Sequence, residues 1–155
     1  MSRWSSSVSR TALVVAVSSL SSAWSAAALA ADVTVAAGAT VSGQKTIGGT
    51  DTVTIGAGGK LTSTSSPTLY QTGTNATGVT IDNAGTIEST GTGTRAIRFN
   101  TGTAMTFSLT NEATGVIQSQ NDAINIGTAV TSGTIVVDNS GTIQSTGVNS
   151  NNGQA

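Results

Sequence analysis

The chain has 155 residues, of which 8% are charged and 3% are aromatic, and it contains 19 glycines, one proline and neither cysteine nor histidine. It is long enough for one domain at most. The absence of cysteine excludes disulfides and thiolate metal sites, and the absence of histidine excludes the commonest general base. The low charge argues against ordinary polar disorder, and the abundant Thr, Ser, Gly, Asn, Val and Ile suit short strands joined by tight turns.

Residues 1–30 have the three parts of a signal peptide. Arg3 and Arg10 give a positive start, the apolar stretch TALVVAVSSL follows, and AAALAA supplies small residues. Cleavage is predicted after Ala30, because the ALA at 28–30 fits the small-x-small rule. A membrane anchor would need roughly 20 apolar residues, and serines interrupt a much shorter run here. The first 30 residues are therefore predicted to be an export signal.

Removal of the signal would make the chain more acidic. Four basic and seven acidic residues would remain, so the formal net charge would change from −1 to 4 − 7 = −3. Such a chain has no basic patch for nucleic acid and no basic amphipathic stretch for a membrane surface. We therefore predict no nucleic-acid partner.

One phrase recurs along the chain after residue 30. It reads VTIGAGGKLTS from Val53, VTIDNAGTIES from Val79, FSLTNEATGVIQS from Phe107 and IVVDNSGTIQS from Ile135, with VTVAAGATVSG from Val33 as a shorter first copy. The four longer copies start 26, 28 and 28 residues apart. Repeats of this length bury their apolar side chains by stacking on neighbouring copies.

Each copy divides into three predicted strands. The first alternates apolar and polar residues, as in 79–81, and an Asn- and Gly-rich turn follows it. The second carries one inward isoleucine, at Ile87, Ile117 or Ile143. The third is AIRFN and then AINIG, with TLYQ as a rougher match, and Thr- and Gly-rich segments such as NTGTAMT and GTAVTSG are expected to be loops.

These strands predict an all-β fold: a right-handed parallel β-helix (β-solenoid) of about four to five rungs over residues 31–155, after an N-terminal signal helix. Equivalent residues of successive rungs would stack about 4.8 Å apart. Asn83, Asn111 and Asn139 would form a column of hydrogen-bonded amides, and the three isoleucines an interior column. A β-sandwich also has many short strands, but it would not require one turn phrase at a constant period.

The sequence offers weak candidates for chemistry. Asp82 and Asp138 occupy equivalent turn positions, but Thr110 lies between them, so turn capping is the preferred interpretation. The segment IGGTDTVTIGAGG lacks the repeated Gly-x-Asp ligands of a calcium-binding repeat, and GTGT from Gly91 lacks the remainder of a phosphate loop. Without histidine, a Ser-His-Asp triad cannot form. We predict no catalytic, cofactor-binding or metal-binding residue and no enzyme activity.

Alternation places Arg98 outside, where a solvated edge charge is the preferred interpretation and a glycan- or anion-binding role is the alternative. A ligand-binding face would need a cluster of exposed aromatic residues, for which Tyr70 is the one candidate. An ice-binding face would need threonine at one position in every rung. The matching positions are Thr54, Thr80, Ser108 and Val136, so a threonine ladder would be broken.

The leader, the Thr/Ser/Gly/Asn-rich repeat with NxGTIxS phrases and the absence of cysteine together resemble the N-terminal part of a bacterial autotransporter (type V secretion) passenger domain. The resemblance covers residues 31–155. It implies export via the periplasm, passage through an outer-membrane β-barrel translocator, and display of a β-helix at the cell surface or outer membrane, or release outside the cell. Many family members serve in adhesion, aggregation or biofilm formation, and some carry protease or esterase domains, which nothing in this sequence matches.

The family's C-terminal barrel is missing, and the chain ends at GVNSNNGQA within the predicted fifth rung, so the repeat region is predicted to be truncated at its C-terminus. We expect a cell-surface or secreted passenger that serves as an adhesin-like scaffold or stalk, with a host-surface or glycan ligand. The alternative is a free exported binding module for carbohydrate or another extracellular ligand. A β-helical polysaccharide lyase would need acidic and basic residues that converge on one groove, and the bases align with no acidic column.

Overall fold

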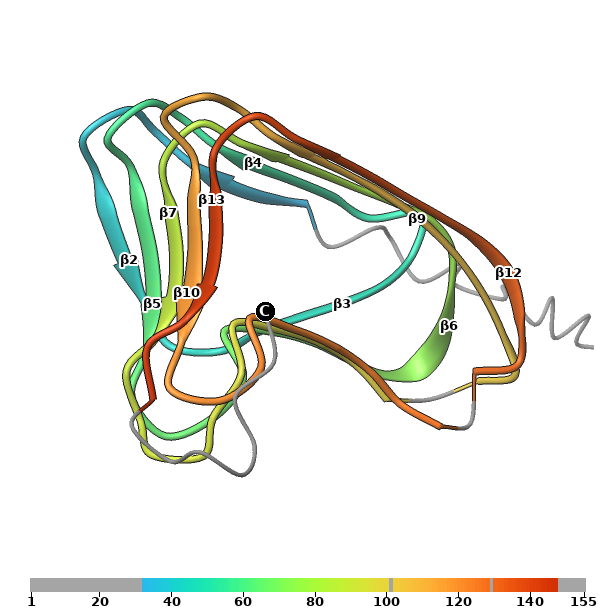
Figure 1. Ribbon diagram of the computed structural model, residues 1–155. Coiled ribbons are helices and arrows are strands. Elements are labelled where there is room, and N and C mark those ends of the chain that lie inside the picture. The colour runs from blue at the N-terminus through green and yellow to red at the C-terminus, as the bar shows by residue number, and fades with distance from the viewer. Residues whose placement is uncertain (1–31, 101, 129, 148–155) are drawn as a thin grey trace, which may run out of the picture.

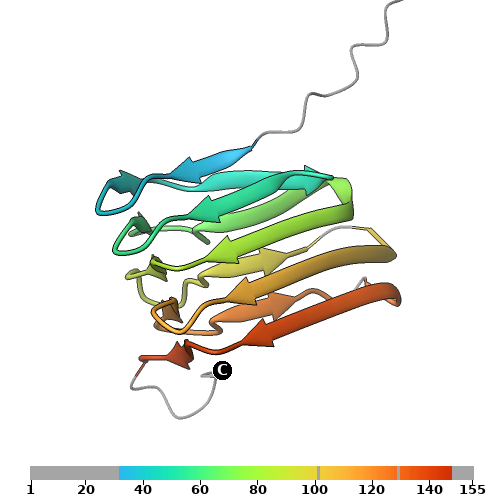
Figure 2. The ribbon, with the colours of Figure 1, turned by 90° about the horizontal axis from the view of Figure 1, so that it is seen from above.

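The chain winds into a stack of parallel coils in a computed structural model that describes residues 32–100, 102–128 and 130–147, without the side chains of 72–74. The strands of the described residues are β1 (Val33–Val35), β2 (Thr40–Ser42), β3 (Lys45–Gly49), β4 (Thr52–Ile55), β5 (Lys60–Ser63), β6 (Leu69–Asn83), β7 (Thr86–Ser89), β8 (Ile97–Phe99), β9 (Ala104–Asn111), β10 (Val116–Ser119), β11 (Ile124–Ile126), β12 (Ser132–Asn139) and β13 (Thr142–Ser145). In Figure 1 the chain runs counter-clockwise as it advances toward the viewer, and Figure 2 shows the coils in sequence order along the stack. The coil is therefore right-handed.

Three parallel walls enclose the interior. The first wall contains β1, β4, the end of β6, β9 and β12. The second contains β2, β5, β7, β10 and β13, and the third contains β3, the start of β6, β8 and β11. With five, five and four stacked strands, the walls confirm the predicted parallel β-helix with three strands in each rung.

Three strands are longer than predicted. β6 runs without a break through the end of one coil and the start of the next, and β9 and β12 begin inside segments that were expected to be loops. That expectation was wrong because the neighbouring coil supplies a partner for each residue: Ser132–Asn139 pairs in register with Ala104–Asn111. Gly133 is required in this ladder, since its φ of 116° is rare for other residues and a Cβ would collide with the carbonyl oxygen of Met105.

The alignment of the Val53 and Val79 copies was wrong by two residues. Val53 lies beside Ile81 rather than beside Val79. The second strands nevertheless keep the 26-residue step, with Leu61 beside Ile87. The turn between the first and second strands is therefore two residues longer in the earlier coil. The sequence VTI, present in both copies, had suggested turns of equal length.

Aliphatic columns fill the interior. On the second wall the column consists of Val41, Leu61, Ile87, Ile117 and Ile143, each in register with the next. Ile87 and Ile117 are completely buried, which confirms the predicted isoleucine column. The rings of Phe99 and Phe107 stack across the interior with centroids 4.5 Å apart.

A ladder of asparagine amides runs along the interior of the first wall. The Nδ2 atom of Asn83 donates to Oδ1 of Asn111, and Nδ2 of Asn111 donates to Oδ1 of Asn139, both at 2.7 Å. The same Nδ2 atoms also reach the carbonyl oxygens of Val116 and Thr142, at 3.3 Å. Asn83 and Asn111 have no exposed surface, so the neighbouring coil satisfies amides that would be costly to bury alone. The predicted asparagine column is confirmed.

The predicted signal helix and its cleavage site lie in residues 1–31, outside the described part of the chain. Within the described part, no helix has the length and apolar character needed to cross a membrane.

The variant Asn111→Asp tests the ladder. An ionised carboxylate cannot donate to Asn139, and burial raises the pKa of a carboxyl group. We expect a loss of about 1–3 kcal/mol in the free energy of unfolding at neutral pH, measured by urea denaturation. The loss should shrink as the pH falls, because a raised pKa favours the folded state at low pH and disfavours it as the pH rises. Asn139→Asp, at the exposed end of the ladder, is the control with a smaller loss, and equal losses would contradict this interpretation.

Candidate functional site

Two polar clusters lie on the outside of the stack. Strand alternation places them there: Ile87 points inward, so the next residue of β7 points outward, and the same holds for Ile97 of β8. We call Lys60, Thr62, Glu88 and Gln118 the Glu88 cluster, on the second wall, and Tyr70, Arg98, Asn100 and Asn125 the Tyr70 patch, on the third wall.

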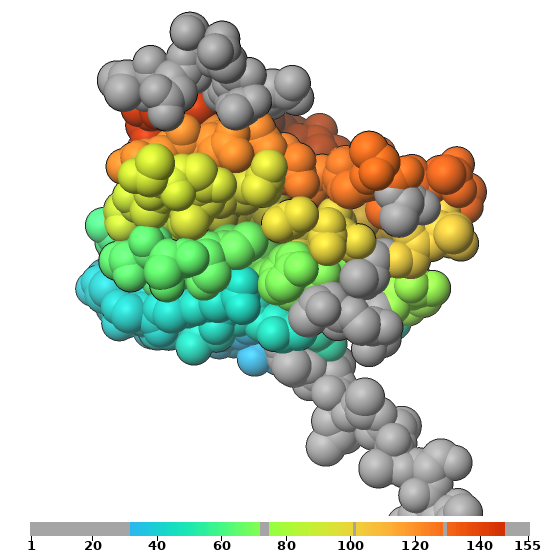
Figure 3. Space-filling model, turned by 90° about the horizontal axis from the view of Figure 1, so that it is seen from below, coloured from blue at the N-terminus to red at the C-terminus, as the bar shows by residue number. Residues whose placement is uncertain are grey.

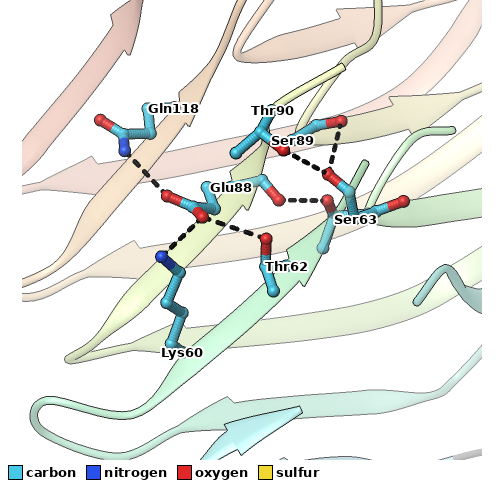
Figure 4. Close-up of polar contacts among 8 residues, drawn as sticks. Lys60, Thr62, Ser63, Glu88, Ser89, Thr90 and Gln118 are labelled. Atoms are coloured by element: carbon cyan, nitrogen blue, oxygen red, sulfur yellow. Dashed lines mark hydrogen bonds and ion pairs between the residues drawn. The ribbon is translucent and has the colours of Figure 1, made fainter. Parts of the chain in front are cut away.

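The Glu88 cluster connects three successive coils. Oε1 of Glu88 lies 2.7 Å from Nζ of Lys60 and accepts a hydrogen bond from Oγ1 of Thr62 at 3.0 Å (Figure 4). Its Oε2 accepts from Nε2 of Gln118, also at 3.0 Å. These contacts arise because Thr62, Glu88 and Gln118 occupy one register position on β5, β7 and β10. The carboxylate is therefore shared by residues that are far apart in sequence.

Burial and hydrogen bonding act in opposite directions on the Glu88 carboxyl. Its side chain is 8% exposed, and burial is the largest single influence and raises the pKa. Hydrogen bonds from Lys60, Gln118 and Thr62, together with the charge of Lys60, outweigh burial and hold the pKa of Glu88 below its ordinary value. Glu88 is thus favoured as a carboxylate, unlike a general acid that must keep its proton at neutral pH.

The serines beside this cluster are not activated nucleophiles. Oγ of Ser89 lies 2.6 Å from Oγ1 of Thr94 and 3.0 Å from the carbonyl oxygen of Ser66. Oγ of Ser63 lies 3.2 Å from Oγ of Ser66. None of these partners is a base that would remove a hydroxyl proton. The contacts close turns and join coils, and they do not prepare a reaction.

The Tyr70 patch combines an aromatic ring with a cation and amides. The guanidinium carbon of Arg98 lies 5.8 Å from the centroid of the Tyr70 ring. Nη2 of Arg98 donates to Oδ1 of Asn100 at 3.0 Å, and Nδ2 of Asn100 donates to the Tyr70 hydroxyl at 3.3 Å. Figure 3 shows this side of the molecule, on which successive coils form layers. Tyr70 and Arg98 are both half-buried, so the predicted solvated edge charge is instead packed over the ring.

The two arginines that flank Ile97 have different surroundings. Nε of Arg95 donates to Oδ2 of Asp122 at 2.8 Å, and Nδ2 of Asn125 donates to the same oxygen at 2.9 Å. The buried Nε of Arg98, by contrast, has no hydrogen-bond partner within residues 32–147 as described. Arg95 thus joins two coils, whereas Nε of Arg98 makes no such link.

The aspartates that the sequence pattern singled out do not come together in the structure. Asp82, Thr110 and Asp138 occupy one register position, so the threonine does lie between the two carboxylates. Oδ2 of Asp51, in the segment compared with a calcium-binding repeat, accepts from the backbone N–H of Gly48 at 2.9 Å. In the described ranges, no group of three acidic side chains is placed to hold a metal ion.

Two further expectations concern the turns and the threonines. The GTGT turn is closed by a hydrogen bond from the backbone N–H of Thr94 to the carbonyl oxygen of Gly91, at 3.2 Å. The register places Thr52, not Thr54, beside Thr80, so the position assigned to Thr54 was wrong by two residues. The broken threonine column is Thr52, Thr80, Ser108 and Val136.

Sequence reasoning missed the Glu88 cluster and the pairing of Arg95 with Asp122. A signal for the cluster was present, because KLTS, TIES and VIQS carry Thr62, Glu88 and Gln118 at the same third position. Comparison of the chain with protein-family models, characterised proteins and solved structures gives no match. A functional proposal therefore has to be argued from these contacts and from the sequence.

The pH dependence of unfolding tests the Glu88 cluster. A lowered pKa means that the carboxylate stabilises the fold above its unfolded pKa of about 4.3 and that this stabilisation is lost as the pH falls through the lower folded pKa. Glu88→Gln should therefore show a weaker loss of stability between neutral and acidic pH than the wild type. Urea denaturation at a series of pH values measures this. Gln144→Ala, a neutral neighbour in the same outer column, is the control, and a wild-type slope in Glu88→Gln would contradict the assignment.

Proposed function

We propose that the chain is an exported passenger β-helix, of the autotransporter kind, that serves as an adhesin-like scaffold or stalk without catalysis. The observation that carries the proposal is the use of polar side chains: they join one coil to the next and do not converge on a reacting centre. The asparagine ladder, the Glu88 cluster and the Arg95–Asp122 ion pair all span residues 26–28 positions apart or further.

A stack built in this way suits a spacer. Each coil contacts its neighbours alone, so length can grow by repetition without a change in the contacts. The outward register positions are dominated by short polar residues, such as Thr52, Thr80 and Ser108 on the first wall. A polar wall of this kind is compatible with contact with water and favours a structural role over turnover.

The proposed location is the cell surface, the outer membrane or the extracellular space, reached via the periplasm. The arginine-flanked apolar leader and the small residues before Ala31 support export. The proposed translocation partner is an outer-membrane β-barrel.

A free exported module that binds carbohydrate or another extracellular ligand is the second candidate. The Tyr70 patch favours it, because an aromatic ring, two amides and a guanidinium can supply stacking and hydrogen bonds to sugar hydroxyls or acidic groups. The patch has one aromatic ring among the described residues, and Arg98 already covers part of it, so we rank this candidate second.

Expression of the full chain with a C-terminal epitope tag in a Gram-negative host tests export. We expect the tagged protein outside the cytoplasm with Ala31 as its first residue, measured by cell fractionation and N-terminal mass spectrometry. Val15→Arg, which interrupts the apolar stretch, is the control that should remain in the cytoplasm with its leader attached. Retention of residues 1–30 on wild-type protein in the cytoplasm would contradict the proposal.

The same exported protein separates the two candidates. On a panel of immobilised glycans, a scaffold that does not bind through the Tyr70 patch should give the same result with Tyr70→Ala as with the wild type. A signal that is lost in Tyr70→Ala but kept in Gln144→Ala, a control on the second wall, would favour the binding module.

A further inference from the structure

The last described coil exposes side chains that are buried in the coil before it. Ile135 and Val137 of β12 are 44% and 45% exposed, whereas Phe107 and Leu109, their register neighbours on β9, are 2% and 1% exposed. β12 pairs with β9 on one side and, within the described ranges, with no strand on the other. Such an edge is a template for another parallel strand.

The asparagine ladder gives this edge a direction. Every amide donates toward the end of the stack, from Asn83 to Asn111 and from Asn111 to Asn139. Asn139 accepts through Oδ1, and its Nδ2 has no hydrogen-bond partner among the described residues. A strand that adds to this edge can therefore supply a hydrogen-bond acceptor to Nδ2 of Asn139. If two such edges met across a two-fold axis, the Nδ2 donors of the two Asn139 side chains would face each other. The two β12 strands would also pair antiparallel, whereas all three walls consist of parallel strands.

The first described coil continues the aliphatic columns at the opposite end of the stack, whereas the column that ends in Asn139 begins there with Val35. Val33 and Val41 begin the same register columns that end in Val137 and Ile143. A second molecule placed with β1 on β12 and β2 on β13 would continue both columns. The carbonyl oxygen of Thr40, which precedes Val41, would then occupy the acceptor position that Val116 and Thr142 supply within the stack.

The turn lengths are also compatible. Six residue steps lead from Val35 to Val41, and four lead from Asn139 to Ile143. The same difference already occurs between the stacked β4–β5 and β6–β7 turns, where Val53 and Leu61 lie beside Ile81 and Ile87. The formal net charge is small, −1 for the full chain and 4 − 7 = −3 without residues 1–30, so repulsion between copies is weak.

We propose that copies of this chain stack head to tail, with the β1–β2 end of one molecule on the β12–β13 end of the next. The contact is heterologous, so it leaves one free end on each assembly and permits growth beyond a dimer. The inference does not depend on the proposed export or adhesion, since it follows from the two ends of the stack.

Sedimentation velocity over a concentration series of the full chain, in the processed form if the leader is removed, tests the proposal. We expect the mean mass to rise with concentration beyond that of a dimer. Val137→Ser should weaken association about tenfold or more, because it removes an aliphatic side chain from the contact. Val136→Ser is the matched control: the neighbouring valine is 52% exposed but lies in the outward column, so association should match the wild type. A monomer at every concentration, or equal effects of the two substitutions, would overturn the proposal.

Mixing two end-blocked variants distinguishes head-to-tail from tail-to-tail contact. Val137→Lys blocks one end and Val41→Lys blocks the other, and circular dichroism checks that each retains its β structure. Each variant alone should be monomeric, and the mixture should form a 1:1 pair that does not grow. Association of Val41→Lys alone to a dimer would show tail-to-tail contact and overturn the proposed arrangement.

Discussion

The register between coils is the constraint on which the rest of the structure depends. Asn83, Asn111 and Asn139 must face one another, because a buried amide without its partner costs about 1–3 kcal/mol. A slip of one residue would also turn the aliphatic columns outward and the polar columns inward. The ladder and the isoleucine column therefore enforce the same alignment from two different walls, Asn111 on the first and Ile117 on the second.

The polar contacts on the outer surface of the stack depend on this register. Glu88 meets Lys60, Thr62 and Gln118 only because three coils place them side by side, and Asp122 meets Arg95 for the same reason. Side chains committed to such contacts join one coil to the next. The same register explains why an end of the stack differs from its middle. The aliphatic columns extend into the last coil, where no further coil among the described residues covers their side chains.

Much of the fold was predictable because the repeat is written into the sequence. Alternating residues such as 79–81 gave the strands, the recurring asparagines gave the ladder, and Ile87, Ile117 and Ile143 gave an interior column. The two-residue offset at Val53 was not predictable. The sequence VTI occurs in both copies, and aligning it hides the two-residue difference in the length of the turn that follows. The extended starts of β9 and β12 were missed because local propensity disfavours Gly and Thr-Gly segments as strands, whereas pairing with a neighbouring coil overrides it. The Glu88 cluster was missed because its register position holds a different side chain in each coil, Thr62, Glu88 and Gln118, whereas the ladder repeats asparagine.

Distances between spin labels on the second wall test the stacked register most directly. The chain lacks cysteine, so Ser42, Gln118 and Gln144, which lie in one outer column, can each be replaced by cysteine and labelled in pairs. The separations should be about 14 Å for 42–118 and about 19 Å for 42–144, since three and four strand spacings of about 4.8 Å divide the residues. Equal separations, or a shorter distance for 42–144 than for 42–118, would contradict a stack of parallel coils in this register.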